Sequence, residues 1–403
     1  MTGNNFIYLD NNASTPIDAE VLKVMDEHRS IFGNPHSGHF LGAISRSALD
    51  VARDQVLSVF GLHADTWSCV FTSGASESNN LAIKGPVMHA LRTNPEKSAT
   101  LITSAMEHAS VDKCVEYLVD LFEKDRVKAD LMPVDEHGVI KLEKVEEMIT
   151  EHVTLISCIQ TVAETGAVEP VAEVAKISKQ IAPNSIFHCD ASQSVGKLSR
   201  ELLHSLSEDV DLITVAGHKF GAPKGVGALL ARKSVISKID PLIHGAGQEF
   251  GLRGGTENVL FAIALGAACK EALNQQKSSE LRDILWKTIT EEFKMGDKQV
   301  DFRLNSTAPT RSPLTINFSV AGINGPALVS KLGSPDSGYI KVCFSAGSAC
   351  HSRGCPTPSK VLAAMGIEQR YSTTGLRLSL GRRTTEAEVL EAGRRIARAI
   401  INV

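Results

Sequence analysis

The stretch Val215-Ala216-Gly217-His218-Lys219-Phe220-Gly221-Ala222-Pro223-Lys224-Gly225 places a lysine in a glycine-rich turn directly after a short apolar run. Continuous apolar runs of this length are typical of strands that are buried on both faces of a parallel sheet. Lysine normally favours solvated surfaces, and a desolvated lysine becomes a nucleophilic amine. Taken alone, such a lysine is more often an ordinary surface lysine, so the interpretation of Lys219 depends on the rest of the chain.

Similar apolar runs recur on both sides of this turn and alternate with amphipathic segments from about residue 45 to 240. This alternation predicts an α/β domain built around a mainly parallel sheet. The expected helices and strands are as follows: helices over 76–90, 110–123 and 171–181, and strands over 68–72, 99–103, 153–159, 185–189, 211–216 and 227–231.

The second part of the chain has a different pattern. After residue 256 it is predicted to be helical to about 293, with strands near 314–320 and 342–345 and a closing helix over 385–401. Thr385 and Glu388 fit a capping box at the start of that helix. We therefore expect two unequal domains: a large α/β domain over 15–258, and a smaller α+β domain formed by 1–14 and 259–403.

The composition limits the classes of function. The chain has 403 residues, 43% hydrophobic and 22% charged, and a formal net charge of −4. It lacks a basic cluster with interleaved aromatics and an apolar run of roughly 18 residues, so neither nucleic acid nor a membrane is expected as a partner. The polar start has neither signal-peptide nor transit-peptide character, which predicts a cytoplasmic location.

Eight scattered cysteines indicate reduced thiols, and the spacing of Cys350 and Cys355 does not fit a structural zinc site, so no metal is expected.

Candidate functional residues follow the predicted strands, where the loops of an open parallel sheet form the ligand crevice. Residues 73–80 form a small-residue turn that opens a helix and offers backbone N–H groups to a phosphate. An ordinary helix cap that binds no ligand has the same sequence pattern. His108 and Asp190 each follow another strand. A phosphate turn, a ring-stacking histidine, a carboxylate for a ring nitrogen and Lys219 for a Schiff base are the groups that pyridoxal phosphate requires.

These motifs resemble the cysteine desulfurase and selenocysteine lyase family, the class V branch of pyridoxal-phosphate enzymes with the type I aminotransferase-like fold. The resemblance runs nearly end to end. It rests on residues 8–16, 33–35, 72–80, 107–108, 190–193, 217–219 and 253–258, and above all on 345–352 and 376–382.

The resemblance implies a role for each matching residue. Lys219 is expected to hold the cofactor and to act as the base at the substrate α-carbon, and Cys350 to accept the chalcogen. Arg377 and Asn11 are expected to bind the substrate, Arg377 through its carboxylate. The implied cofactor-binding residues are Lys219, His108 (stacked on the ring and also catalytic), Asp190 (ring nitrogen), Gln193 (ring hydroxyl), Ala75, Ser76 and His218 (phosphate), and Thr256 (phosphate of the partner subunit in a homodimer).

The implied activity is removal of selenium or sulfur from L-selenocysteine or L-cysteine to give L-alanine, with a selenenyl-sulfide or persulfide on Cys350 and a possible acceptor protein downstream. The segment Cys350-His351-Ser352 looks closer to the selenocysteine lyase loop, which favours that substrate. A housekeeping cysteine desulfurase and a transaminase or other lyase are alternatives. Ala163 and Ala216 depart from the family's usual Asn and Ser, and so motivate a third alternative, a weak homologue acting as a binding or sulfur-carrying scaffold.

Overall fold

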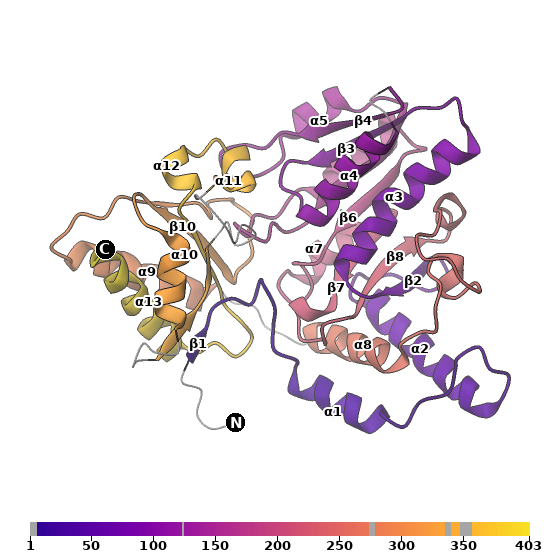
Figure 1. Cartoon of the computed structure of the whole chain (residues 1–403), viewed down its shortest axis with the longest axis horizontal. Coiled ribbons are helices and arrows are strands. Elements are labelled where there is room, and N and C mark those ends of the chain that lie inside the picture. The colour runs from indigo at the N-terminus through magenta and orange to yellow at the C-terminus, as the bar shows by residue number, and fades with distance from the viewer. Residues whose placement is uncertain (1–5, 123–124, 274–278, 335–339, 347–356) are drawn as a thin grey trace.

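The computed structural model describes residues 6–122, 125–273, 279–334, 340–346 and 357–403. Cys350, its neighbour His351 and Cys355 therefore lie outside the described residues. Figure 1 shows two parts side by side, a larger one that contains the labels β2, β3, β4, β6, β7 and β8 and a smaller one that contains β10, α9 and α13.

The larger part is built on a seven-stranded sheet with strand order β2-β8-β7-β6-β5-β3-β4. All neighbouring pairs are parallel except those of β8, which runs antiparallel to β2 and β7. The mainly parallel sheet predicted from the sequence is thus confirmed. Its strands are β2 Trp67–Thr72, β3 Ala99–Ser104, β4 Val127–Met132, β5 Val153–Ile159, β6 Ile186–Asp190, β7 Leu212–Ala216 and β8 Gly227–Arg232.

Both faces of this sheet are buried, which explains its continuous apolar strands. In β7, Ile213 and Val215 enter one hydrophobic core while Leu212 enters the other, as the two-residue period of a strand requires. Helices α3 and α4 supply the core around Leu212, and α2, α6 and α8 supply the opposite core. The helices of this part are α1 Ala19–His28, α2 Phe40–Ser58, α3 Ala75–Thr93, α4 Ala109–Leu121, α5 Leu142–Met148, α6 Val171–Ile181, α7 Arg200–His204 and α8 Val259–Leu273.

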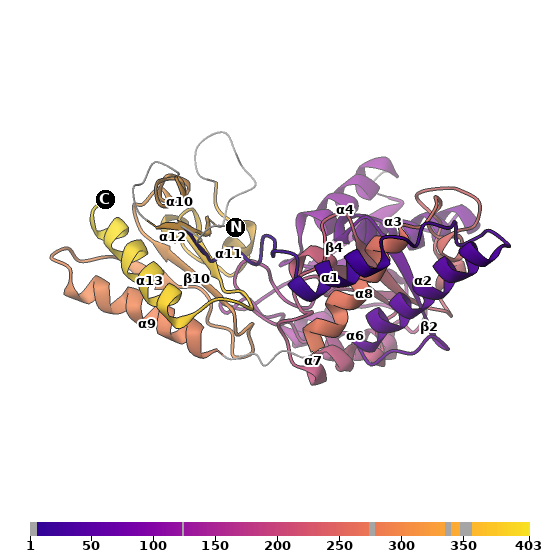
Figure 2. The same ribbon diagram turned by 90° about the horizontal axis from the view of Figure 1, so that it is seen from below.

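The smaller part has a four-stranded sheet, a parallel strand pair and a separate hydrophobic core. Figure 2 shows α9 and α13 lying along one side of this part. Thr385 and Glu388 form the predicted capping box at the start of α13. The elements are β1 Phe6–Tyr8, α9 Glu280–Met295, β9 Phe302–Leu304, β10 Thr315–Val320, α10 Gly325–Gly333, β11 Lys341–Cys343, β12 Ser345–Ala346, α11 Lys360–Ala364, α12 Gln369–Ser372, β13 Gly375–Ser379 and α13 Glu386–Ile401.

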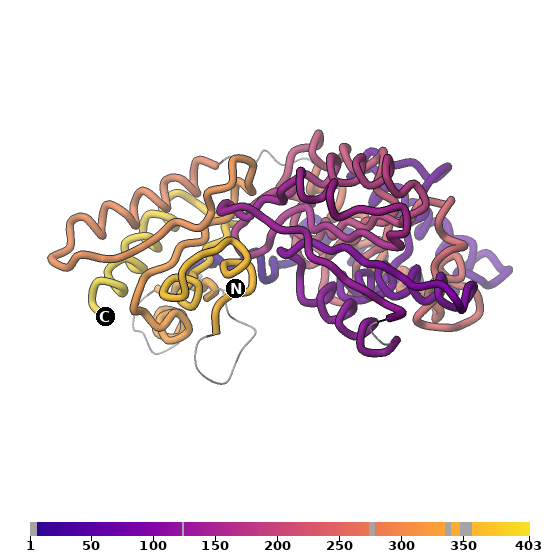
Figure 3. Tube along the Cα trace, turned by 90° about the horizontal axis from the view of Figure 1, so that it is seen from above, coloured from indigo at the N-terminus to yellow at the C-terminus, as the bar shows by residue number. Residues whose placement is uncertain are grey.

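Helix α8 packs in the larger part, whereas the predicted boundary at residue 258 assigns it to the smaller domain. Ala262, Leu265 and Cys269 of α8 lie in a core of the large sheet, although the sequence had suggested that residues from 259 onward belong to the smaller domain. A boundary after α8 fits this packing better than one at residue 258. The N-terminal strand β1 does belong to the smaller part, where it pairs with β11. Figure 3 shows the chain then running from the smaller part into the larger one.

Across the described part of the chain, every helix is too short or too polar to cross a membrane.

Candidate active site

Lys219 lies in the short 3-10 turn Gly217–Lys219 directly after β7, at the carboxyl end of the sheet. Its Nζ donates hydrogen bonds to the backbone oxygens of Asn12, at 2.7 Å, and Ala13, at 3.0 Å. Burial, followed by the nearby positive charge of Arg377, lowers the pKa of Lys219 to about 8. At pH 7 roughly a tenth of this amine is therefore uncharged, far more than for an ordinary lysine, and the uncharged form is the one that a nucleophile or base requires.

Asp190 ends β6, the strand next to β7, and only 2% of it is exposed. Its Oδ2 accepts a hydrogen bond from Nδ2 of Asn79 at 2.8 Å, and its Oδ1 accepts one from the backbone of Ser192 at 2.9 Å. Hydrogen bonds to the charged form stabilise a buried carboxylate. The carboxyl end of the sheet thus presents a carboxylate that can pair with a protonated ring nitrogen.

A chain of hydrogen bonds joins Asp190 to His108. The second Nδ2 hydrogen of Asn79 goes to the hydroxyl of Ser110 at 2.8 Å, and that hydroxyl lies 2.8 Å from Nδ1 of His108. The backbone N–H of Ser110 also points at this Nδ1, at 3.1 Å. Because Nδ1 is surrounded by donors, the ring proton of a neutral His108 resides on Nε2. This network fixes the ring of an exposed histidine at the start of α4.

The predicted phosphate turn opens α3. Gly74 is the N-cap residue and has no side chain, so the described residues provide no side-chain cap for the first N–H groups of this helix, around Ala75 and Ser76. A side chain at Gly227 would come within 2.8 Å of the backbone of Gly74, so the close approach of β8 to this turn requires glycine. The turn presents unpaired donors at the positive end of a helix, which suits a phosphate.

His218 stands beside Lys219, and its Nδ1 lies 3.2 Å from the hydroxyl of Ser14. Burial, followed by the charges of Lys219 and Lys224, lowers the pKa of His218 to about 4. At neutral pH the ring is uncharged, so His218 can offer a phosphate a hydrogen bond but no positive charge.

Gln193 is buried and is held by two residues that the sequence interpretation did not single out. Its Nε2 donates to the backbone oxygen of Asn12 at 2.8 Å, and its Oε1 accepts from the ammonium of Lys197. Lys197 also donates to Oδ1 of Asn12 at 2.8 Å. An ammonium only donates hydrogen bonds, so Lys197 fixes which end of the Gln193 amide is the oxygen. The other Nε2 hydrogen of Gln193 makes no hydrogen bond to the described residues and is available for a ligand.

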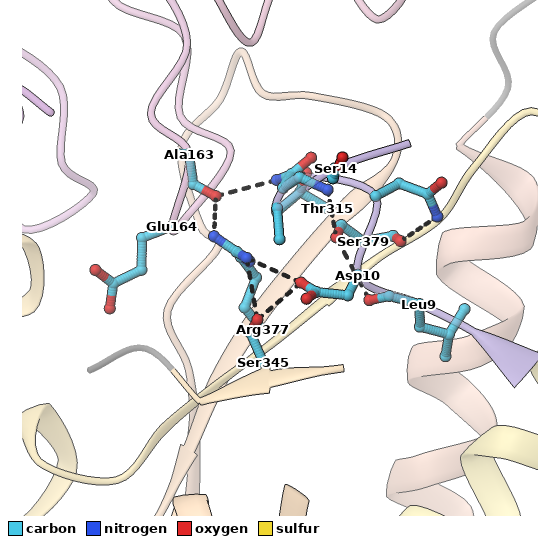
Figure 4. A network of polar contacts seen from close by, with 12 residues as sticks. Leu9, Asp10, Ser14, Ala163, Glu164, Thr315, Ser345, Arg377 and Ser379 are labelled. Atoms are coloured by element: carbon cyan, nitrogen blue, oxygen red, sulfur yellow. Dashed lines mark hydrogen bonds and ion pairs between the residues drawn. The ribbon is translucent and has the colours of Figure 1, made fainter. Parts of the chain in front are cut away.

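Arg377 lies on β13, on the smaller part of the molecule (Figure 4). Its Nη2 contacts Oδ1 of Asp10 at 2.9 Å and the hydroxyl of Ser345 at 3.2 Å, and its Nη1 contacts the backbone oxygen of Ala163 at 3.4 Å. The same Ala163 oxygen accepts a hydrogen bond from Nδ2 of Asn12 at 3.0 Å. The site therefore joins both parts of the chain.

Two other predicted site residues, Asn11 and Thr256, form no hydrogen bond with Lys219, Asp190 or Arg377 in the described part of the chain, although Asn11 lines the same pocket as Lys219. The amide of Asn11 donates to the backbone oxygen of Ser379 at 3.0 Å, so it ties the N-terminal segment to β13, and its role toward substrate stays a prediction. Thr256 is exposed, and a carboxylate oxygen of the adjacent Glu257 lies 2.8 Å from Nε2 of His36. The buried Ala216 ends β7 just before the Lys219 turn.

The residues missed from the sequence are Asn12, Asn79, Lys197 and Asp10 as contact residues of the site. Asn12 and Asp10 stood inside a quoted motif, and Asn79 inside the phosphate turn, but no spacing rule assigned them partners. Lys197 follows the small and apolar run Ser194-Val195-Gly196, where a lysine is out of place. That contrast is the one sequence feature that points to a buried charge.

The arrangement fits pyridoxal phosphate. The uncapped start of α3 supplies a phosphate cradle, and the doubly hydrogen-bonded Asp190 supplies a partner for the ring nitrogen. The Gln193 N–H that makes no hydrogen bond among the described residues offers a hydroxyl contact, and the half-buried amine of Lys219 is the attachment point. No cluster of three or more potential metal ligands occurs among the residues that the structure describes.

Comparison with known proteins agrees with this class of site. The family model for aminotransferase class-V matches residues 7–391, so the chain belongs to the aminotransferase class-V family of pyridoxal-phosphate enzymes. Pyridoxal phosphate is accordingly its cofactor, as predicted.

The particular relatives are named cysteine desulfurases. Cysteine desulfurase IscS of Rickettsia massiliae is 34% identical over 394 residues, which cover 95% of this chain and 88% of that protein. A probable mitochondrial cysteine desulfurase of Dictyostelium discoideum is 35% identical over 391 residues, covering 95% and 80% of the two chains. A solved structure described as a NifS-like protein has a TM-score of 0.84 and 31% identity, over 99% of this chain and all of that one.

Proposed function

We propose that this chain is a pyridoxal-phosphate-dependent cysteine desulfurase, which converts L-cysteine to L-alanine and takes up the sulfur on Cys350. The observation that carries the proposal is the half-buried Lys219 amine, with its pKa lowered to about 8, at the same carboxyl end of the sheet as the carboxylate of Asp190. The names of the relatives support the choice of reaction within this cofactor class.

The overall reaction balances without a further reagent. The substrate C–S bond breaks, a bond forms between the substrate sulfur and the Cys350 sulfur, and L-cysteine plus a thiol become L-alanine plus a persulfide. When bound, pyridoxal phosphate supplies an electron sink for the negative charge that develops at the substrate α-carbon.

Each described side chain has a task in this scheme. Lys219 removes the α-proton in its uncharged form, which its lowered pKa makes available. Asp190 holds the positive charge of the ring nitrogen, and the Asn79 network orients His108. Arg377 binds the substrate carboxylate, because its planar fork suits two parallel hydrogen bonds.

Sulfur is a better supported substrate atom than selenium. The sequence interpretation favoured selenocysteine on the strength of the segment around Cys350, which lies outside the described residues. The relatives are named cysteine desulfurases, which favours the alternative reading, the housekeeping type. A protein acceptor for the persulfide and a cytoplasmic location stay expectations, and one relative is a mitochondrial protein by name.

A homodimer is part of the proposal. Helix α2 buries Leu49 and Val56 on one face, and on the opposite face it exposes an apolar stripe of Phe40, Ile44 and Val51. Phe32, in the preceding segment, is 78% exposed, and His36 of that segment holds the loop of Thr256 through Glu257. An unpaired apolar face next to a loop expected to reach the partner's phosphate fits an interface between two copies.

The test is alanine release from matched L-cysteine and L-selenocysteine, read alongside the cofactor absorbance. We expect turnover of cysteine, loss of alanine release in both Lys219→Ala and Cys350→Ser, and loss of cofactor attachment only in Lys219→Ala. Purified protein that stays colourless after addition of pyridoxal phosphate would favour the scaffold alternative. Unchanged turnover in Cys350→Ser would instead indicate a transaminase or another lyase.

A further inference from the structure

The carboxylate of Asp10 accepts a hydrogen bond from the Arg377 guanidinium and so uses part of its hydrogen-bonding capacity (Figure 4). Oδ1 of Asp10 lies 2.9 Å from Nη2 of Arg377, and the hydroxyl of Ser345 donates to the same Oδ1 at 2.8 Å. The backbone holds the three residues together, because Asp10 bridges to Ser379 at the end of β13 and Ser345 pairs with Arg377 across β12 and β13. The two charged side chains are only 21% and 15% exposed.

The donors of Arg377 are not exhausted by these contacts. Among the described residues, its Nε is buried without a hydrogen-bond partner, and its Nη1 makes only the 3.4 Å contact with the oxygen of Ala163. A guanidinium has five N–H donors and binds a carboxylate best through two parallel hydrogen bonds. Asp10 engages a single nitrogen. A second carboxylate can therefore bind Arg377 more strongly than Asp10 does.

We infer that Asp10 is the resting partner of Arg377, which the substrate carboxylate displaces, and that this exchange sets the affinity for substrate. The inference rests on the proposed function, in which Arg377 binds that carboxylate. Asp10 acts through Arg377 and is thus a positioning residue.

Ser345 makes the exchange possible at moderate cost. A shielded carboxylate that loses its only partner carries a large desolvation penalty. The Ser345 hydroxyl already donates to Asp10 and can remain there when Arg377 turns to the substrate. Asp10 and Ser345 should consequently have opposite effects on ligand affinity.

The test measures binding of propionate to the holoenzyme by calorimetry and by the shift of Tm with ligand concentration. Propionate has the substrate's carboxylate but neither its amine nor its thiol. We expect Asp10→Asn to lower Kd by about twofold to fivefold, which lies in the range for removing one partner of a partly exposed ion pair. Ser345→Ala should raise Kd, and it should have little effect when Asp10→Asn is already present. The KM for cysteine should fall in Asp10→Asn in the same way.

Arg377→Ala tests the role of Arg377 as the carboxylate anchor separately from its exchange with Asp10. If it leaves propionate binding intact, Arg377 is not the anchor and that part of the proposed function fails. If it abolishes binding but Asp10→Asn leaves Kd unchanged or raises it, the anchor stands and the exchange is overturned. A lowered Tm for Asp10→Asn without tighter binding would mark the ion pair as purely structural, and Ser345→Ala provides the independent, opposite-sign check.

Discussion

The ammonium of Lys197 lies 2.8 Å from Oδ1 of Asn12 in a position where only 5% of the lysine is exposed. Within the described residues its hydrogen bonds go to two amide oxygens, those of Asn12 and Gln193, and to no carboxylate. Burial, followed by the charges of Lys219 and Arg377, holds the pKa of Lys197 well below the ordinary lysine range. Burial without an acidic partner makes the charged form of this amine costly, so its position next to the cofactor residues calls for a function.

Lys197→Met should weaken the cofactor site without weakening the fold. The change frees the Gln193 amide to rotate and leaves two buried oxygens without a donor, while it removes an amine whose charged form is costly to bury. We expect the Kd for pyridoxal phosphate to rise about tenfold, the equivalent of roughly 1.4 kcal/mol, and the stability of the cofactor-free protein to change little. Equilibrium titration of the cofactor and urea unfolding measure the two quantities. A loss of stability that accounts for the whole effect would make Lys197 merely structural.

The large sheet and the Lys219 turn could be predicted because their pattern is local. Strand β5 and helix α6 match their predicted ranges, since a buried strand is a continuous apolar run and the helix is amphipathic. Strand β4 was missed because it lies at the sheet edge, where four consecutive residues, including Lys128 and Asp130, are exposed. Helix α8 is apolar on nearly all sides, so its sequence does not reveal which core it enters.

The candidate site was predicted where a residue's chemistry is visible in its own motif, as for Lys219, Asp190 and Arg377. The partners that tune these residues were not. Asn12 contacts Gln193, Lys197 and Lys219, which are at least 181 positions away in the chain. Such contacts depend on how the N-terminal segment crosses between the two parts, which no local period or spacing encodes.

The lowered pKa of Lys219 gives the cofactor-free protein a pH-dependent stability. The pKa in the folded state is about 8, against an ordinary value of 10.5, so the unfolded chain binds more protons between these two pH values. The free energy of unfolding should therefore rise as the pH increases from about 8 to about 10.5. In Lys219→Met this contribution disappears, and the variant should be more stable than the wild type below pH 8.

Urea unfolding of both cofactor-free proteins from pH 7 to 10 measures that difference. A repeat of the measurement with Lys197→Met in both proteins removes the titration of Lys197, whose pKa the charge of Lys219 helps to lower. A wild-type curve parallel to that of Lys219→Met over this range would mean that Lys219 has an ordinary pKa.

Glu164 is a half-buried acid near Arg377, and the effect of pH on its contribution to stability has the opposite sign. Its Oε2 accepts a hydrogen bond from Ser359 at 2.8 Å, and burial outweighs this contact and the charge of Arg377 to raise the pKa of Glu164 to about 7. The folded protein binds more protons than the unfolded chain between about pH 4.5 and 7, so stability falls as the pH rises through that window.

Glu164→Gln keeps an acceptor for Ser359 and removes the charge. It should be more stable than the wild type at pH 8 by on the order of 1 kcal/mol, with the difference vanishing near pH 4. Thermal and urea unfolding at both pH values check this. A destabilised variant at pH 8 would show that the Glu164 carboxylate is held ionised by Arg377.

The exposed stripe on α2 should control both oligomeric state and cofactor retention. A double change, Phe40→Glu with Ile44→Glu, puts two like charges on the face that Val51 also belongs to, and leaves the buried face of α2 untouched. We expect a dimer in the wild type and a monomer in the variant by analytical ultracentrifugation. The variant should also hold pyridoxal phosphate more weakly, because Thr256 of the other copy is expected to complete the phosphate site.

Leu121→Glu is the matched control, since Leu121 ends α4 and is 50% exposed. It adds the same side chain at an apolar surface position of another helix. The mass of the dimer in solution and the cofactor affinity should both stay unchanged. If the α2 variant stays dimeric, the interface lies elsewhere. If it becomes a monomer with undiminished cofactor affinity, each chain completes its own phosphate site, and the role expected of Thr256 is wrong.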